Sequence, residues 1–147
     1  MKVSTRGRYG TRLMLDLALH QGNEPVLLRD ISQRQDIPLA YLKHIVSPLI
    51  AGGLIRSSRG VKGGILLTRA PGQIKMDEVI RFLEGPIAAV ECVDHPETCH
   101  RSGYCAARDI WTEIGEAIDG VLESITLQDL ADRQKAKSPD RADMYCI

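Results

Sequence analysis

The sequence predicts a mainly α-helical protein with one small β-hairpin and one long helix near its C-terminal end. Apolar residues recur at every third or fourth position in most segments between the Gly and Pro breaks, which is the helical period. Two short apolar runs instead flank the glycine-rich loop 58–64, which is typical of a hairpin. Aromatic residues make up 4% of the 147 residues, so we expect helices packed through Leu, Ile and Ala.

Length and composition fit a single soluble domain, with or without an appended helix. No apolar run approaches the roughly 20 residues that span a bilayer, and the first residues lack the apolar stretch of a signal peptide. We therefore expect a cytoplasmic protein. Because thiols stay reduced in that compartment, the four cysteines are expected to be ligands or redox groups before structural disulfides.

Three helices are expected before the hairpin. The first begins at Ser4 or Thr5 and ends before Gly22, the second covers 28–34 and the third covers 39–51. Their spacing predicts inward-facing Tyr9, Leu13, Met14, Leu17, Ala18, Leu28, Ile31, Leu42, Ile45, Leu49 and Ile50. Pro48 lies inside the third helix and predicts a kink or an early end there, since proline removes a helical hydrogen bond.

The second and third helices match a helix-turn-helix. The turn between them is short, and the third helix has no acidic residue and carries Tyr41, Lys43 and His44 on its outer face. Strands at 54–57 and 65–68 then surround a loop that carries Arg59 and Lys62. A helix-turn-helix followed by a basic hairpin predicts a winged helix-turn-helix domain over residues 1–84. No phosphate-binding Gly-x-x-x-x-Gly-Lys-Ser/Thr pattern competes with this interpretation.

Charge is divided unevenly along the chain although the net charge is zero. Residues 1–69 contain 11 Lys and Arg against four Asp and Glu, a net charge of +7, and residues 37–69 contain no carboxylate. A basic segment of this kind is often only a solvated surface, but its helix-turn-helix and wing pattern favours double-stranded DNA as the partner.

The second half is expected to hold a helix at 73–83, a long helix at 106–124 and a short last helix with Thr126 and Asp129 as a capping box. The buried stripe of the first of these is Ile74, Val79, Ile80 and Leu83. The long helix has an apolar seam of Ile110, Ile114, Ala117, Ile118, Val121 and Leu122, with Trp111 beside it. We expect a second subunit to cover the seam in a homodimer; the alternative is packing on its own domain. The expected divisions are a loop at 85–105, the two helices at 106–133 and a mobile tail at 134–147.

Cys92, Cys99 and Cys105 lie in an irregular loop with C-x6-C-x5-C spacing. Zinc is disfavoured, because zinc sites usually pair cysteines two to four residues apart. Iron–sulfur clusters accept soft thiolates from irregular loops, which favours a cluster. A metal-free thiol switch and a role as small buried apolar residues remain open. Thiol catalysis with His20, His44, His95 or His100 is not expected, because no acid or base pattern accompanies them.

Several motifs together resemble the IscR-like family of winged-helix iron–sulfur regulators, which has NsrR-like, RirA-like and cluster-free CymR-like relatives. They are the opening Lys-Val-Ser-Thr-Arg-Gly-Arg-Tyr-Gly, Asp30-Ile-Ser-Gln-Arg-Gln-Asp-Ile, Tyr41-Leu, Gly53-Leu-Ile-Arg-Ser-Ser-Arg-Gly, Gly63-Gly-Ile-Leu-Leu, the three cysteines, Trp111 and Ile125-Thr-Leu-Gln-Asp-Leu. The resemblance covers residues 1 to about 131. It implies a dimeric DNA-binding transcriptional regulator, such as a repressor, that senses iron or cluster supply, redox state or nitric oxide through a cluster on Cys92, Cys99 and Cys105.

The chain departs from the IscR-like pattern in three places, and one of them is the gap between Cys92 and Cys99, which is one residue longer than in the IscR-like members. The position of the family's fourth ligand, three residues after the last cysteine, is Arg108; His100, His95, Asp94, Glu97 or a partner group would replace it, and a [4Fe–4S] cluster is favoured over [2Fe–2S]. The family's base-contacting positions fall on Ala40, Lys43 and His44, while Tyr41 and Arg59 match outright. Lys43 stands where the IscR-like members have an acid, so a different operator is expected. Cys146 has no role assigned by the resemblance.

Overall fold

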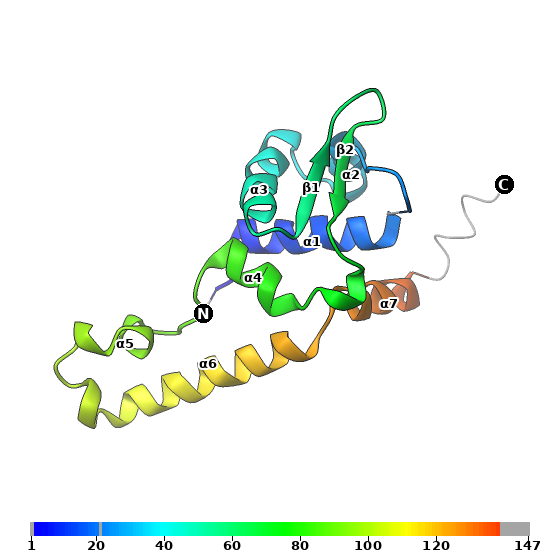
Figure 1. The fold of residues 1–147 in the computed structure, drawn as a ribbon. Helices are drawn as coiled ribbons and strands as arrows, with labels where there is room; N and C mark the ends of the chain where they lie inside the picture. Colours follow the sequence, from blue (N-terminus) through cyan, green and yellow to red (C-terminus); the bar gives the residue numbers. More distant parts are fainter. Residues whose placement is uncertain (1, 21, 139–147) are drawn as a thin grey trace.

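The computed structural model describes residues 2–20 and 22–138, in which a helical head carries a small two-stranded sheet and a long arm (Figure 1). The head begins with α1 (Thr5–His20), α2 (Leu28–Gln35), α3 (Leu39–Ala51), β1 (Ile55–Ser58), β2 (Gly64–Leu67) and α4 (Met76–Glu84). The chain continues through α5 (Glu91–Asp94), α6 (Ala106–Ser124) and α7 (Leu127–Lys137), with 3₁₀ turns at Pro71–Gln73, Pro96–Thr98 and Ser102–Tyr104. The predicted mainly α fold with a hairpin wing is confirmed.

The first three helices begin and end close to the predicted residues. Ser4 caps α1, because its Oγ accepts a hydrogen bond from the Gly7 N–H at 3.1 Å. Asp36 ends α2 in the left-handed conformation, with φ 52°, and its neighbour Ile37 is buried in the short turn before α3. The predicted helix-turn-helix is therefore formed by α2 and α3.

Helix α3 has its predicted range, but it differs from the prediction at Pro48, where no early end occurs, and at Ile50. The helix does not end early at Pro48 but continues to Ala51, and the Pro48 carbonyl accepts the Gly52 N–H at 2.9 Å. Leu49 is fully buried, so packing on this side of the helix offsets the hydrogen bond that proline removes. Ile50 was predicted to face inward but is 39% exposed, and Val46 is buried instead.

The wing, defined as β1, loop 59–63 and β2, is an antiparallel hairpin with Ile55 paired to Leu67 and Ser58 to Gly64. Val26 adds a third position to this sheet, because it exchanges two backbone hydrogen bonds of 2.9 Å with Ile65. A Cβ atom on Gly64 would lie 2.4 Å from the Val26 carbonyl oxygen, so this close approach requires glycine. The wing is thus fixed to the segment that joins α1 to α2.

A single apolar core connects the helices of the head, and it includes residues from both ends of the chain. Leu17, Leu42 and Leu83 are fully buried in it, and Leu127 of α7 joins them. Thr126 and Asp129 form the predicted capping box at the start of α7, with Asp129 accepting the Thr126 N–H at 2.8 Å. The head therefore consists of residues up to 84 together with α7.

Helix α7 continues to Lys137, beyond the expected boundary at 133. The rest of the expected tail, including Cys146, lies outside the described residues. Within residues 2–20 and 22–138, no helix combines the length and apolar character needed to cross a membrane.

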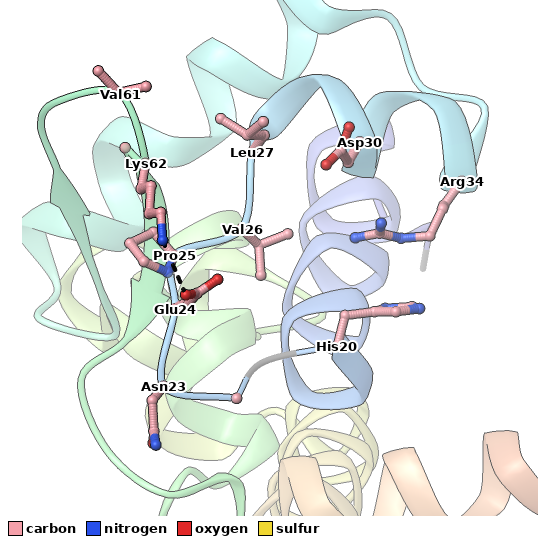
Figure 2. Close-up of a pocket in the computed structure, with 12 residues that line it drawn as sticks. His20, Asn23, Glu24, Pro25, Val26, Leu27, Asp30, Arg34, Val61 and Lys62 are labelled. Carbon is pink, nitrogen blue, oxygen red and sulfur yellow. Dashed lines mark ion pairs between the residues drawn. The ribbon is translucent and has the colours of Figure 1, made fainter.

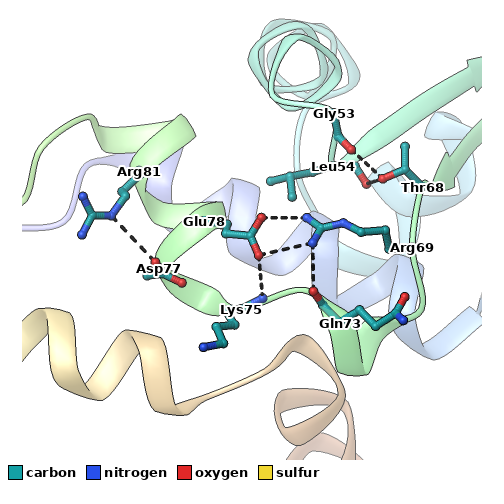
Figure 3. Close-up of polar contacts among 9 residues, drawn as sticks. All are labelled: Gly53, Leu54, Thr68, Arg69, Gln73, Lys75, Asp77, Glu78 and Arg81. Carbon is teal, nitrogen blue, oxygen red and sulfur yellow. Dashed lines mark hydrogen bonds and ion pairs between the residues drawn. The ribbon is translucent and has the colours of Figure 1, made fainter.

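A polar junction joins the end of the wing to α4 (Figure 3). Arg69 follows β2 and donates to both carboxylate oxygens of Glu78, at 2.7 and 3.4 Å, and to the Gln73 carbonyl at 2.9 Å. Glu78 also accepts the Lys75 N–H at 3.3 Å. The hydrogen bond from Arg69 is the main cause that holds the pKa of Glu78 below its ordinary value of 4.5.

This junction makes stability depend on pH in the acidic range. Because the pKa of Glu78 is lowered in the folded state, its contribution is present above the unfolded pKa and is lost as pH falls through the folded pKa. We expect Glu78→Gln to lower the free energy of unfolding at pH 7 by up to about 1 kcal/mol, the range of partly exposed ion pairs. The variant should also show a smaller loss of stability between pH 5 and pH 3, as checked by urea unfolding. Glu123→Gln, on an exposed part of α6, is the control, and equal acid sensitivity of all three proteins would contradict the assignment.

Candidate nucleic-acid interface and cysteine loop

The outer face of α3 is formed by the predicted contact residues. Ala40, Lys43 and His44 are exposed, and Ser47 continues the same face one turn later. The opposite face is buried in the core through Leu42, Ile45, Val46 and Leu49. This division positions a neutral-to-basic helical surface toward solvent, which is the arrangement needed to enter a major groove.

Tyr41 is half-buried and lies beside this face. Its ring meets that of Tyr9 edge-on, with centroids 5.4 Å apart and an interplanar angle of 85°. The guanidinium groups of Arg8 and Arg12 lie 5.8 and 5.7 Å from the Tyr9 centroid. Tyr41 therefore fixes the start of α3 against α1 and brings two arginines of α1 near the reading face, a connection that the sequence pattern did not predict.

The wing places Arg59 and Lys62 at an exposed tip. Gly60 adopts φ 110° there, and its carbonyl accepts the Gly63 N–H at 3.0 Å, which closes the turn. Val61, between the two predicted DNA contacts, is fully exposed although it is apolar. Val61 was not among the predicted contacts, although an apolar residue between Gly60 and Lys62 at a hairpin tip is a signal in the sequence.

A hollow lies between the tip of the wing, the 22–27 segment and α2 (Figure 2). Lys62 reaches across its rim to Glu24, with the ammonium and carboxylate 3.7 Å apart. Both side chains are more than three-quarters exposed, so the pair contributes little to stability and Lys62 is free to exchange Glu24 for a phosphate. On the far side of the hollow, Arg34 is held by Asp16 instead.

The reading side of the head carries positive charge. Among the described residues, Lys43, Arg56 and Arg59 take part in no ion pair, whereas Arg34 and Arg69 are paired with buried or half-buried carboxylates. Asp16 also raises the pKa of Arg34 through its hydrogen bonds. Lys43 of α3 and Arg56 and Arg59 of the wing therefore contribute positive charge that no carboxylate in the described part of the chain neutralises.

The cysteine loop, defined as residues 92–105, lies at the end of α6 that is far from the wing (Figure 1). Cys92 lies within α5, Cys99 follows a 3₁₀ turn, and Cys105 caps the start of α6; all three thiols are free and half-buried. No regular structure was predicted here, but short helical turns occupy much of the loop. They are too short to produce an apolar period.

The thiols do not converge on one point in this structure. Across the described residues, no group of three or more His, Cys, Asp or Glu side chains is arranged to hold a metal ion. Of the predicted replacement ligands, His95 contacts Glu97 at 3.2 Å, while Asp94 and His100 are exposed. Three cysteine thiols in one loop are a suitable set of donors for an iron–sulfur cluster, and binding one would require the loop to bring them together.

Helix α6 has an apolar face that residues 2–20 and 22–138 leave uncovered. Ile114, Ala117, Ile118, Val121 and Leu122 line a shallow apolar groove along it. Ile110 and Val121 are 56% and 57% exposed, and Trp111 is 40% exposed. Another face of α6 packs on the head, where Arg81 of α4 lies 3.4 Å from Asp119. The long helix therefore both contacts its own domain and presents a free apolar seam.

Known proteins are similar to this chain in sequence and in architecture. A family model described as Rrf2, iron-dependent transcriptional regulator, matches residues 3–133. The transcriptional regulator CymR of Bacillus subtilis is 42% identical over 131 residues, covering 89% of this chain and 90% of CymR. The transcriptional regulator IscR of Xenorhabdus nematophila is 39% identical over 135 residues, covering 92% of this chain and 82% of IscR.

Solved structures of regulators with these names have the same overall fold as this chain. That of CymR from B. subtilis, described as the global cysteine regulator of that organism, has a TM-score of 0.77 at 40% identity and covers 90% of this chain and 98% of its own. That of T. potens IscR has a TM-score of 0.77 at 35% identity, covering 94% and 91%. These relatives are transcriptional regulators and not enzymes. The chain therefore belongs to the Rrf2 family of DNA-binding transcriptional regulators.

Proposed function

We propose that this protein is a homodimeric transcriptional regulator whose operator affinity is set by the chemical state of Cys92, Cys99 and Cys105. The observation that carries the proposal is the position of three reduced, half-buried cysteines in the loop between the head and the apolar helix α6. An iron–sulfur cluster is the group we propose for this loop, supported by the donor set and by the similarity to IscR.

The second candidate is a metal-free thiol regulator of the same fold. It is supported by the 42% identity to CymR, because the CymR-like relatives named in the sequence resemblance are cluster-free. In this candidate two thiols give up two electrons and two protons to an oxidant and form a disulfide. Both candidates use the same cysteines and differ in whether iron is bound.

A change at the cysteine loop reaches the head through α6 and α4. Arg81 of α4 and Asp119 of α6 approach within 3.4 Å. The C-terminal end of α4 in turn contacts the start of α1, because Ser4 donates its N–H to Glu84 at 3.0 Å and Arg6 donates to the Leu83 carbonyl at 2.6 Å. In a dimer joined through α6, a shift of α6 alters the separation of the two reading helices, and operator affinity follows.

Anaerobic purification tests which candidate holds. We expect a visible absorption band with matching iron and acid-labile sulfide, and loss of both in a Cys92→Ser, Cys99→Ser, Cys105→Ser triple variant. Cys146→Ser, outside the described residues, is the matched control and should keep the band. A colourless, iron-free parent that binds its operator in a thiol-dependent way would reject the cluster and support the thiol regulator. Operator binding unaffected by the triple variant, by chelators and by oxidants would reject both.

The DNA contact makes a separate prediction. About eight phosphate contacts in a dimer correspond to a slope near −7 in a plot of log affinity against log salt concentration. Arg59→Ala removes one contact from each subunit and should reduce the slope by about 2. The measurement is fluorescence anisotropy with a duplex that the protein itself selects from random-sequence DNA. Lys135→Ala, on α7, is the charge-matched control, and an unchanged slope for Arg59→Ala would remove the wing from the interface.

A further inference from the structure

Arg108 contacts the backbone of both end cysteines of the loop. Its Nε donates to the Cys92 carbonyl at 2.9 Å, and its Nη2 lies 3.4 Å from the Val93 carbonyl. Its own N–H donates to the Cys105 carbonyl at 3.1 Å. We call this set of contacts the Arg108 clasp; it closes the segment from 92 to 105 from a single residue.

The acceptors of the clasp need a partner. Helix α5 has four residues, so its last carbonyls are not used by a following helical turn; the Glu91 carbonyl accepts the His95 N–H, but Cys92 and Val93 lie beyond it. Arg108 is part-buried and supplies a charged donor at that end of α5. In its own helix the position is unfavourable, because a cation lies in the first turn of α6 near the positive end of the helix dipole. The cross-loop contacts therefore account for the placement of this arginine better than α6 itself does.

The chemistry of the side chain also limits its role. A guanidinium has five N–H donors, stays protonated and offers no lone pair to a metal. Arg108 can therefore orient the loop but cannot ligate a metal ion in it.

We infer that Arg108 is a positioning residue that orders the cysteine loop on the start of α6 without any metal. The inference rests on the proposed function, in which this loop is the sensing segment. It adds that the ordered loop is a property of the metal-free chain, so that iron binding or thiol oxidation must act on a loop already attached to α6 through its backbone.

Hydrogen–deuterium exchange of the reduced, chelator-treated full-length protein tests the clasp. We expect amides of residues 93–105 to exchange about tenfold faster in Arg108→Ala than in the parent, as removal of a charge-assisted hydrogen bond predicts. Arg108→Lys keeps the charge but not the two-pronged donor, and should restore part of the protection. Arg101→Ala, which removes an exposed arginine of the same loop, should exchange like the parent.

Two results would overturn the clasp. One is parent-like exchange of residues 93–105 in Arg108→Ala. The other is a loss of protection in Arg108→Ala and in Arg108→Lys that is as large in the buried amides of α1 and α3 as in the loop. That result would assign Arg108 to global stability instead. Neither result depends on the operator assay. If DNA binding by the parent does not depend on its cysteines, the proposed function is contradicted. Faster loop exchange in Arg108→Ala would still support the clasp.

Discussion

Replacing Asp16 by alanine is expected to lower the free energy of unfolding by about 3 kcal/mol. Asp16 is fully buried, and within residues 2–20 and 22–138 it is the one charged side chain that is buried. It accepts two hydrogen bonds from Arg34, at 2.7 and 3.1 Å, and one from Gln35 at 2.9 Å. Removing one partner of a buried pair costs about 3–5 kcal/mol, and the lower end applies because Arg34 is one-third exposed and regains water.

The exposed pair Glu24–Lys62 supplies the contrast. Glu24→Ala should change the free energy of unfolding by less than about 0.5 kcal/mol, because both partners are solvated. Asp16→Asn keeps the shape of the side chain and some of its hydrogen bonds. Its free energy of unfolding should therefore lie between those of Asp16→Ala and Glu24→Ala. Urea unfolding at pH 7 measures all three variants. Equal stability of Asp16→Ala and Glu24→Ala would mean that the contacts joining α1 to α2 do not support the head.

The contrast between these two pairs also indicates what the sequence can and cannot predict. The helical spacing of Leu13, Leu17 and Leu42 predicted the core face correctly, because periodicity reports burial directly. Asp16 lies on the same buried face, one residue from Leu17, yet a carboxylate at that position does not fit the apolar helical period and so predicts exposure. Its partner is 18 residues away, and local spacing carries no information about that distance.

Tertiary packing accounts for the other differences. Pro48 was expected to kink α3 or to end it early, and the helix does not end early but continues to Ala51, with Leu49 fully buried. Helix α7 was recognised by its capping box, whereas its return to the core of the head through Leu127 required the fold. The apolar seam of α6 was predicted, but the pattern did not distinguish the face that packs near Arg81 from the face left open.

The candidate site divides in the same way. Lys43 and His44 are exposed as predicted because the helical period of α3 separates its core face from its solvent face, and Arg59 is exposed in the predicted hairpin loop. The cysteines were correctly assigned to one loop, but their expected convergence on a metal is not found in this arrangement. The sequence showed only that Arg108 occupies the position of the family's fourth ligand. Its hydrogen bond to Cys92, 16 positions earlier, is a long-range contact without a local signal.

The second large effect is expected from Val121→Glu, which should convert the proposed dimer to a monomer and lower operator affinity by at least about 100-fold. Val121 is 57% exposed in the single chain and lines the apolar groove of α6, so the charge is tolerated in a monomer. In an isologous dimer the substitution appears twice, and two unpaired carboxylates at a buried seam cost several kcal/mol. Losing simultaneous binding to two half-sites then removes an avidity gain of about 10²–10⁴.

Sedimentation velocity measures the association, and emission of Trp111, the single tryptophan of the chain, reports whether the seam is covered. The emission maximum should shift to longer wavelength in Val121→Glu as that side chain becomes hydrated. Glu116→Gln, on an exposed position of the same helix, should leave mass, emission and affinity unchanged. A Val121→Glu protein that remains dimeric, with native unfolding behaviour, would place the subunit contact elsewhere. The coupling proposed from the cysteine loop to the reading helices would then lack its route, because a shift of α6 changes the spacing of two heads only when α6 joins them.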